Sequence, residues 1–595
     1  MEDTEDTMTL LRECLLHKDH IGVKKLILED KFKDDSKFWE LMGMLGECIN
    51  KENLKCSPGF LDVCERCMRY IINVGNVKEL LLALLEQADT FDDSVKFKTF
   101  VDLIQKCILK LPSKQLFSLE LTLETLADCI VKLELPNDIE TDEESLAEGL
   151  DPEVEDMNTF LTAYLDFLVP FVDQADITKS SSSSGITEDD IKIQRNFLSK
   201  YLLRLFDHPL STLNLMITEG HSGLIVKTTA RLNADLAVSL LLKLNKSVFD
   251  IVDKSSEHNE KVIHILRSKS NGDSAELEQV SNVALGCLEY LSLVEYAAYF
   301  GNPCLVWKVG ILEMSLPLVL CLVSKTLSEP RKKGIALLKA LMPEDTNIFS
   351  YEDLARPEYF RILGSLFTIM IHSPMKSVRQ ECVQIVPRFI QMFDNEGRYQ
   401  ISMKLFGTLE HAGAVGYCVQ LLKNQMDELF ADKWSGSKTA HVFTGLNLKR
   451  LFLLITGLPD GPATDLVEQS DRIISVLNLI RYIVLKDPAE QNVTGFWDFC
   501  SEIEREFLEE VHTGLDMAKA HYQLEVSGLW EGNKRKGGAN ENVEMSVSVA
   551  GFKLPSMPRG QKMAIMNQAL NTLDLMTSLL VRVNELIEQQ SKLKM

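Results

Sequence analysis

The residues of this chain that could carry chemistry are few, and the most suggestive are four cysteines. Cys48, Cys56, Cys64 and Cys67 lie close together in the sequence and could supply four thiolates to a zinc ion. Their spacings fit no structural zinc module, so we favour the alternative that these thiols pack as small apolar side chains in a reducing compartment. The sequence therefore predicts no metal and no cofactor.

Other reactive arrangements are missing from the sequence. The 11 histidines form no His-Glu-x-x-His motif, no Gly-x-Ser-x-Gly elbow presents a serine nucleophile, and no glycine-rich loop is placed to cradle phosphate. His258 and His264 are six residues apart, so on a helix they point in opposing directions and make poor joint ligands. We expect a protein that is not an enzyme. An enzyme with an unfamiliar site is the alternative from another class.

The overall charge and hydropathy exclude several partners. The formal net charge is -24, and such a negative field repels phosphate backbones and anionic lipid. The longest nearly apolar stretch, residues 314–323, is far shorter than the roughly 20 residues that span a bilayer. Residues 1–6 are acidic where a signal or transit peptide is basic. We therefore expect no nucleic-acid partner, no membrane partner, no export and a cytoplasmic location.

The elements that carry these residues are predicted to be helices, because apolar residues recur at helical spacing along nearly the whole chain. The clearest stripe lies within residues 563–587 and steps by three or four: Met566, Leu570, Leu573, Met576, Leu580, Val583 and Ile587. The exception is near the C-terminus. There, residues 532–538 indicate a basic, glycine-rich loop, and the alternation of apolar and polar residues over 543–549 indicates one short β-strand.

An internal repeat indicates the architecture. Pro330 and Pro374, 44 residues apart, each stand near the start of an expected helix, and residues 359–371 supply another helix between them. A fainter third unit is expected at 411–430. The period falls in the range of about 40 to 47 residues that is typical of HEAT and armadillo repeats. The predicted fold class is an all-α, HEAT/armadillo-like solenoid with a short β element, and binding is the default function of such a fold.

Acidic and serine-rich segments divide the chain. Residues 135–156 are crowded with Asp and Glu, and the serine run Ser180–Ser184 ends at Gly185. Both indicate solvated linkers, with phosphorylation as the functional alternative for the serines. We therefore predict four parts: N-terminal repeats (1–134), linkers around a single helix near 160–171 (135–190), central repeats (191–409) and a C-terminal partner-binding region (410–595).

The C-terminal third carries a specific resemblance, which rests on an ordered set of short motifs and not on a single one. In order they are Lys423-Asn424-Gln425, Phe443-Thr444-Gly445, Leu458-Pro459-Asp460-Gly461, Thr464-Asp465-Leu466, Ser470-Asp471-Arg472-Ile473, Leu477-Asn478-Leu479-Ile480-Arg481-Tyr482, Leu485-Lys486-Asp487 and Ala518-Lys519-Ala520-His521-Tyr522. This set resembles the glomulin family, as does, more loosely, Lys78-Glu79-Leu80-Leu81-Leu82 upstream.

The resemblance implies a function. Glomulin-like proteins bind the RING subunit of cullin-RING ubiquitin ligases through their C-terminal region and cover the surface where the ubiquitin-conjugating enzyme docks. Inhibition by occlusion is therefore implied. Contacts with an FKBP-type immunophilin and with a receptor tyrosine kinase are also implied, and a scaffold that bridges such partners is the alternative function. A nuclear location follows if Lys534-Arg535-Lys536 acts as a nuclear signal, although a solvated loop tip is the simpler interpretation.

Five polar residues are the candidate partner contacts. Between His411 and Lys486 the sequence has eight Lys/Arg and seven Asp/Glu, a net charge of 8 - 7 = +1 in a chain whose total is -24. A few charged side chains within an apolar surface suit an interface with a RING subunit. The candidates are Lys423, Gln425, Arg472, Arg481 and Lys486.

Helical geometry constrains two of these candidates. We expect Ser470 to be the N-cap of a helix over 473–485. Arg472 and Arg481 are nine residues apart, about two and a half turns, so they face opposite ways. At most one of them can contact a given partner, and packing against a neighbouring repeat is the alternative role for each. The chain also departs from the family: Val442 stands where a tryptophan is expected, with Trp434 eight residues earlier.

Overall fold

The computed structural model describes most of the chain. The described residues are 2–28, 37–87, 93–111, 115–133, 152–178, 188–216, 218–219, 225–268, 280–295, 305–431, 442–534, 548–549, 552–553 and 559–593. The chain divides into two compact units, Met1–Met342 and Pro343–Met595. None of the expected boundaries at 134, 190 and 409 coincides with this division, and the finer four-part organisation stays a prediction.

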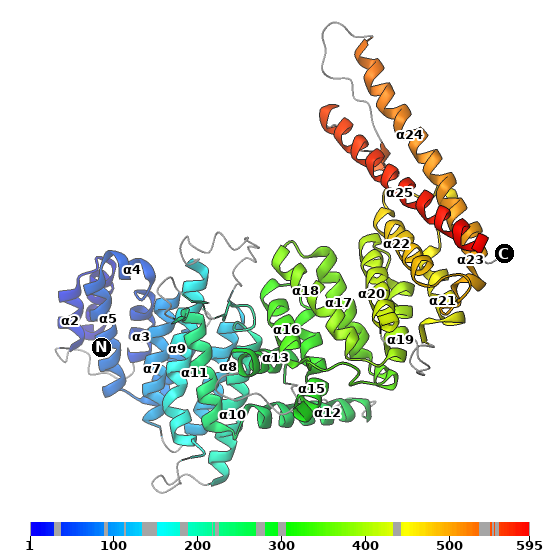
Figure 1. Cartoon of the computed structure of the whole chain (residues 1–595). Helices are drawn as coiled ribbons and strands as arrows, with labels where there is room; N and C mark the ends of the chain where they lie inside the picture. The colour runs from blue at the N-terminus through cyan, green and yellow to red at the C-terminus, as the bar shows by residue number, and fades with distance from the viewer. Residues whose placement is uncertain are drawn as a thin grey trace. The chain divides into compact units, whose positions relative to one another are not determined.

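The first unit is built from helices (Figure 1). They are α1 (Glu2–Leu16), α2 (His20–Leu28), α3 (Phe38–Glu47), α4 (Lys51–Cys56), α5 (Pro58–Val74), α6 (Val77–Glu86), α7 (Ser94–Leu109), α8 (Gln115–Val131), α9 (Pro152–Ala175), α10 (Glu188–Asp207), α11 (Thr229–Leu244), α12 (Val248–Ser268), α13 (Asn282–Tyr290), the π-helical turn η5 (Leu291–Glu295), α15 (Leu305–Val323) and α16 (Ser328–Leu341). Two short strands, β1 (Thr218–Glu219) and β2 (Ile225–Val226), pair antiparallel.

Within this unit the helices stack in chain order. Helix α3 packs on α6, α5 on α7, α7 on α9, and α9 on α11, while α10 packs on α13 and α15 on α16. Each helix buries an apolar stripe against its neighbours, as α5 does with Phe60, Cys64, Cys67 and Ile71. A lone pair of helices could not bury both faces, so the stack forms one continuous core.

The apolar stretch at 314–323 is a core helix, as the sequence predicts. It forms the C-terminal half of α15, where Leu316, Val319 and Leu322 are buried. Among the helices of the described residues, none is both long enough and apolar enough to cross a membrane.

A buried carboxylate makes the first unit sensitive to pH. Glu289 of α13 is fully buried, and burial raises the pKa of this group from 4.5 to about 7, an effect that the Ser315 hydroxyl partly offsets. Below pH 4.5 the side chain is neutral in both the folded and the unfolded state. As the pH rises towards 7 the unfolded chain releases this proton first, so the folded state loses stability.

Replacing this carboxylate by an amide is expected to remove that loss. Glu289→Gln should be more stable than the parent protein by roughly 2–3 kcal/mol at pH 8, and by much less at pH 5. Urea unfolding at both pH values measures this difference. The exposed Glu120→Gln is the control and should behave alike at both pH values. A Glu289→Gln effect of equal size at pH 5 and pH 8 would show that ionisation of this group does not limit stability.

The second unit is also helical (Figure 1). Its elements are η6 (Tyr351–Ala355), α17 (Pro357–His372), α18 (Lys376–Gln391), α19 (Asn395–Thr408), α20 (Ala412–Ala431), α21 (Gly445–Thr456), η8 (Gly461–Ala463), α22 (Ser470–Lys486), η9 (Phe496–Asp498), α23 (Cys500–Ile503), η10 (Glu504–Leu508), α24 (Glu509–Lys534), β3 (Ser548–Val549), β4 (Phe552–Lys553) and α25 (Arg559–Leu593).

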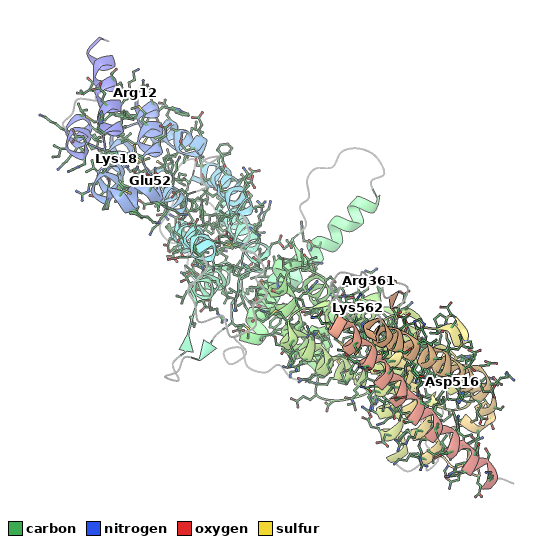
Figure 2. The ribbon with its side chains drawn as sticks, turned by 90° about the horizontal axis from the view of Figure 1, so that it is seen from above. Arg12, Lys18, Glu52, Arg361, Asp516 and Lys562 are labelled. Atoms are coloured by element: carbon green, nitrogen blue, oxygen red, sulfur yellow. The ribbon has the colours of Figure 1, made fainter. Side chains whose placement is uncertain are left out.

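Helix pairs again provide the packing of this unit. Helix α17 packs on α18, α19 on α20 and α21, and α20 on α22. Helix α22 is central, because α25 packs on it as well. The long helices α24 and α25 lie side by side, and Figure 2 shows the same pair from above, with Asp516 and Lys562 labelled. Lys519 of α24 and Asp574 of α25 form an ion pair of 2.7 Å between them.

Several predicted helices are confirmed. The stripe within 563–587 lies in α25, where all of its members except the half-buried Leu570 are buried. The helices expected at 359–371 and 411–430 are α17 and α20. Pro330 lies in the first turn of α16, and Pro374 lies two residues before α18. The prolines therefore stand at helix starts, because the first turn has no use for the missing N–H.

Other predictions were wrong in their bounds. The helix expected near 160–171 is α9, which starts at Pro152, because Glu153 and Glu155 stabilise its positive end instead of forming a linker. The rest of the expected linkers, including Ser180–Ser184, lies outside the described residues. Residues 532–534 are the end of α24 and not part of a loop.

The predicted short β element is not seen as one strand. Of residues 543–549 the structure describes only Ser548–Val549, which pair antiparallel with Phe552–Lys553. Two residues per strand are too few to make a sheet that stands on its own. The regular structure of the described residues is therefore almost entirely helical.

Candidate functional site

Helix α22 is the element that positions the predicted site. Ile473, Val476, Ile480, Ile483 and Val484 are buried at helical spacing between α20 and α25. The expected N-cap was wrong: Ser470 is the first helical residue, and the cap position is Gln469, whose side chain makes no capping hydrogen bond. The residues between the apolar positions of α22 are left for the surface.

Two glycines hold the start of α21 against the segment that follows α22. Gly445 has a φ of +55° and Gly495 a φ of +72°, a region that side chains with a Cβ rarely adopt. A Cβ at Gly495 would lie 3.0 Å from Gly445 Cα, and the Gly445 amide donates to Thr494 O at 2.8 Å. The family motif Phe443-Thr444-Gly445 is thus needed for a close backbone approach.

A buried aspartate at the end of α22 shapes the same segment. Asp487 is 1% exposed, and its carboxylate accepts hydrogen bonds from Val493 N at 2.8 Å and from Thr494 N at 2.7 Å. The Thr494 hydroxyl donates a further bond of 2.5 Å. The Trp497 indole N–H donates to the Asp487 carbonyl at 2.8 Å. The motif Leu485-Lys486-Asp487 therefore ends α22 at a fixed place.

Removing this carboxylate is expected to destabilise the second unit. Asp487→Ala leaves the buried Thr494 amide and the part-buried Val493 amide without acceptors, so the free energy of unfolding should fall by about 2–4 kcal/mol. Urea unfolding followed by tryptophan fluorescence measures the loss. The control is Asp427→Ala, because the Asp427 side chain is 54% exposed and its loss should matter little. Equal effects of the two substitutions would contradict the structural role of Asp487.

The structure brings two of the five candidate residues together around one tyrosine. The Lys423 Nζ lies 5.6 Å and the Lys486 Nζ 6.0 Å from the centre of the Tyr482 ring. The Tyr482 hydroxyl donates to Asp427 Oδ1 at 2.6 Å, and the Lys486 Nζ lies 3.9 Å from the same oxygen. Lys423 and Asp427 come from α20, while Tyr482 and Lys486 come from α22. Lys423, Asp427, Tyr482 and Lys486 form what we call the α20–α22 surface.

The electrostatics of the α20–α22 surface favour an acidic partner. Burial and the hydrogen bond to Asp427 raise the pKa of Tyr482, so its ring stays neutral as a platform for the two ammonium groups. Two ammonium groups surround one carboxylate, and the Lys486 side chain is 54% exposed. The net charge of these groups is 2 - 1 = +1. In a chain with a charge of -24 this is a local exception.

The other three candidate residues lie elsewhere. Arg472 is half-buried and its guanidinium donates to the carbonyl of Gly457, at the end of α21; burial lowers the pKa of Arg472. Arg481 is exposed, as expected from the opposite directions of the two arginines. Gln425 is 8% exposed within α20, so a direct contact with a partner would require that helix to move.

The sequence prediction missed Asp427 and Tyr482. A signal for both was present, because Lys423 and Asp427, and Tyr482 and Lys486, are each four residues apart. That spacing places each pair on one face of its helix. The contact between the two pairs, however, depends on the packing of α20 on α22.

The departure at Val442 does not disturb the core. Val442 is half-buried, and the next residue, Phe443, is 2% exposed and packs on Tyr399 with the ring centres 6.1 Å apart. Phe443 is therefore buried in the core although the residue before it is a valine. Trp434 lies outside the described residues.

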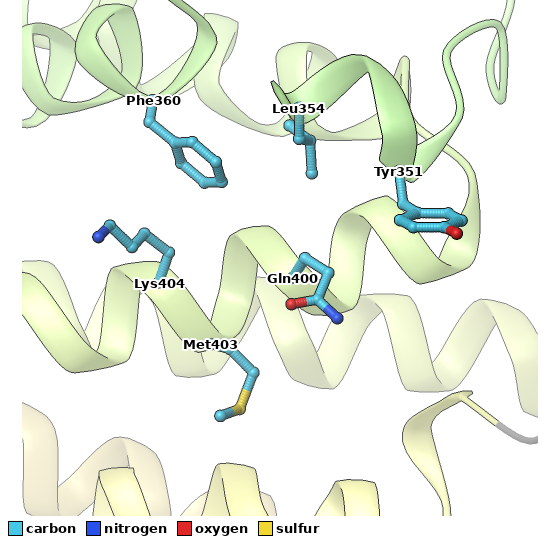
Figure 3. Close-up of a pocket in the computed structure, with 6 residues that line it drawn as sticks. All are labelled: Tyr351, Leu354, Phe360, Gln400, Met403 and Lys404. Carbon is cyan, nitrogen blue, oxygen red and sulfur yellow. The ribbon is translucent and has the colours of Figure 1, made fainter. Parts of the chain in front are cut away.

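A shallow groove lies on the surface of the second unit. It has a volume of about 550 Å³ and lies between η6 and α17 on one side and α19 on the other. Figure 3 shows Tyr351, Leu354 and Phe360 facing Gln400 and Lys404, and Met403 also lines it. Among these six residues Lys404 carries the single charge, and Tyr351 is the other titratable side chain.

The cysteines that suggested zinc are not equivalent in the structure. Cys64 and Cys67 are buried in α5, Cys48 is half-buried and Cys56 is exposed. In the described part of the chain, no three His, Cys, Asp or Glu side chains are grouped as metal ligands. Stacked helix pairs define the class of protein: an all-helical protein whose long surface suits the binding of other proteins.

The comparisons with known proteins agree with this class. Residues 38–266 and 316–565 match the family model of the uncharacterised protein family YAP/Alf4/glomulin, and the chain belongs to this family. Glomulin of Mus musculus is 28% identical over 570 residues, which cover 93% of this chain and 88% of that protein. Glomulin of Homo sapiens is 27% identical over 576 residues, with the same coverage.

Solved structures were compared with the chain as well. A mutant of Kap121p is 11% identical, with the match covering 84% of this chain and 61% of that chain at a TM-score of 0.20. A score this low supports no conclusion about the fold, which rests on the helix packing described above.

Proposed function

We propose that this chain binds the RING subunit of cullin-RING ubiquitin ligases and covers the surface on which the ubiquitin-conjugating enzyme docks. The chain would then inhibit ubiquitin transfer by occlusion, with no cofactor and no catalytic step of its own. Membership in the YAP/Alf4/glomulin family supports this proposal, as does the resemblance of the ordered C-terminal motifs to glomulin. The helix stack, which we interpret as HEAT-like, supplies a long surface for such a partner.

The observation that carries the proposal is the α20–α22 surface. Lys423 and Lys486 are held on the Tyr482 ring, so two cations are presented from two helices that pack on each other. Arg481 is also exposed on α22. Cations that are held in place by an aromatic ring lose less entropy on binding than free ones do. Arginine and tyrosine are also enriched among the residues that dominate interface energies.

A reconstituted ligase tests the proposal. Ubiquitin-chain synthesis by a cullin-RING ligase is measured with and without the full chain, at rising concentrations of conjugating enzyme. Occlusion predicts that synthesis falls in the presence of the chain and recovers with excess conjugating enzyme, because the two compete for one surface. Undiminished synthesis, or inhibition that excess enzyme does not relieve, would reject occlusion.

A scaffold that bridges an FKBP-type immunophilin or a receptor tyrosine kinase to another complex is the second candidate. The observation that favours it is the division of the chain into two units, each with its own core, because two units can hold two partners. Co-precipitation of both partners by one copy of the full chain would support bridging. Under this function ubiquitin synthesis stays unchanged.

A further inference from the structure

Helices α8 and α10 of the first unit meet at their C-terminal ends. They pack on each other, and the Arg204 guanidinium lies 3.7 Å from the Asp128 carboxylate. Asp128 is the fourth residue from the end of α8, and Arg204 is the fourth residue from the end of α10. The last turns of the two helices are therefore adjacent.

The C-terminal end of α9 joins the earlier parts of the same two helices. Gln115, the first residue of α8, donates from its side-chain amide to the Gln174 side-chain oxygen at 2.8 Å. Arg195, in the first half of α10, donates from Nε to the Ala175 carbonyl at 2.6 Å. Because both helices contact neighbouring residues of α9 near their starts and contact each other near their ends, they run parallel.

Two exposed apolar residues of α8 lie on the face that carries Asp128. Leu121 and Phe117 precede Asp128 by 7 and 11 residues, which is close to two and three full turns of helix. Phe117 is 70% exposed and Leu121 is 39% exposed. Helix α8 therefore presents two large apolar side chains to solvent, in line with its contact to α10.

Helix α10 has the same arrangement. Phe197 and Ile193 precede Arg204 by the same 7 and 11 residues, and Ile193 is 43% exposed while Phe197 is half-buried. Equal steps back from the ion pair along two parallel helices reach equal levels. Phe197 is therefore level with Leu121, and Ile193 is level with Phe117. We call these four residues the α8–α10 face.

Carboxylates surround the α8–α10 face. Helix α8 carries Glu120, Glu124 and Asp128 and has no Lys or Arg. On α10, Asp189 lies four residues before Ile193 and so shares its side of the helix. Single exposed apolar side chains are common on soluble proteins, but a group of them with a polar rim is typical of a binding site.

The cations of α10 lie towards one end of this face. The Lys200 Nζ and the Arg204 Cζ are each 5.7 Å from the centre of the buried Tyr201 ring, and Arg204 also faces Asp128. Two cations stand against the four carboxylates Glu120, Glu124, Asp128 and Asp189, a net charge of 2 - 4 = -2. This balance favours a cationic partner.

We propose that the α8–α10 face binds a basic amphipathic helix of a partner protein. Two parallel helices present two rows of side chains, and a third helix packs along such rows with apolar residues spaced three and four apart. Lysine or arginine beside that apolar stripe would meet the carboxylates of α8. The face belongs to the first unit and prefers the opposite charge from the α20–α22 surface, so this inference does not depend on the proposed function.

A designed peptide serves as the probe. It has about 18 residues, or five turns of helix, with Leu on one face at spacings of three and four, Lys elsewhere and a fluorescent label. Fluorescence anisotropy measures its Kd for the full chain. It should bind at least about tenfold more tightly than two control peptides, one with the same residues in scrambled order and one with Glu in place of Lys.

Matched variants assign the binding to this face. Phe117→Ala with Ile193→Ala should weaken binding of the Lys peptide about tenfold, because two large apolar contacts are lost. The control is Leu16→Ala with Ile21→Ala, since both side chains are exposed, on α1 and α2, and Kd should stay within about twofold. These side chains are on the surface, so thermal unfolding should give both double variants the Tm of the parent protein.

A charge variant tests the carboxylates. Glu124→Lys should weaken binding of the same peptide about fivefold, whereas Glu52→Lys on α4 should leave it unchanged, although Glu52 is exposed as well. Equal binding of the Lys and Glu peptides, or equal weakening by the two double variants, would overturn the proposal. Self-association of the chain that Phe117→Ala with Ile193→Ala abolishes, measured by sedimentation velocity, would assign the face to a second copy and would overturn it too.

Discussion

The double substitution Lys423→Glu with Lys486→Glu is expected to weaken binding of the RING subunit by about 30-fold or more. Both ammonium groups lie over the Tyr482 ring, so reversal of their charge turns a surface of net charge +1 into one of -3. An acidic partner would then be repelled where it is now attracted. Calorimetry or surface plasmon resonance on the purified RING subunit measures the change in Kd. Inhibition of ubiquitin synthesis should fall in parallel.

A control with the same change in charge separates a local contact from general electrostatics. Lys376 and Lys404 are exposed on α18 and α19 of the same unit. Lys376→Glu with Lys404→Glu should leave Kd within about twofold. Charges that lie away from the contact surface act mainly on the association rate. Equal weakening by the two double variants would remove the α20–α22 surface from the proposed interface.

The largest loss of stability is expected from Arg231→Met in the first unit. Arg231 is fully buried, and its guanidinium donates to Asp235 at 2.6 Å, to Glu295 at 2.7 Å and to the carbonyl of Leu215 at 2.9 Å. Methionine fills similar space but removes the cation from the Glu295 carboxylate, which keeps its hydrogen bond from the Tyr290 hydroxyl. Breaking a buried ion pair by removing one partner costs about 3–5 kcal/mol. Urea or thermal unfolding of the full chain measures this loss.

An exposed pair of the same kind is the control. Arg12 forms an ion pair of 2.6 Å with Glu40, but the two side chains are 62% and 41% exposed, and Figure 2 shows Arg12 in the N-terminal helices. Exposed pairs contribute at most about 1 kcal/mol, so Arg12→Met should change stability little. If Arg231→Met were no more harmful than Arg12→Met, the buried network would not hold α11 to η5.

The helical fold could be predicted from the sequence because its signal is local. The apolar residues of α25 recur every three or four positions. This spacing places them on one face of a single helix, and that face packs on the core. The starts of α16 and α18 could be predicted for the same reason, since proline acts on its own turn. The start of α9 could not, because an acidic run is equally compatible with a linker and with a first helical turn.

The candidate site could be predicted in part. Lys423 and Lys486 were selected by charge, and the structure has them in one cluster. Gln425 and Arg472 were selected by the same reasoning, but they are buried or half-buried because of what packs beside their helices.

The sequence by itself determined the class of this protein: a helical chain of the glomulin family. The apolar spacing and each of the ordered motifs involve only a few neighbouring residues. The tertiary structure decided which polar side chains meet and which reach the surface. Tyr482 and Asp427 are 55 residues apart in the chain and yet 2.6 Å apart between their oxygens. Such contacts are fixed by the packing of whole helices, and this packing depends on the summed burial of many side chains, which no local pattern encodes.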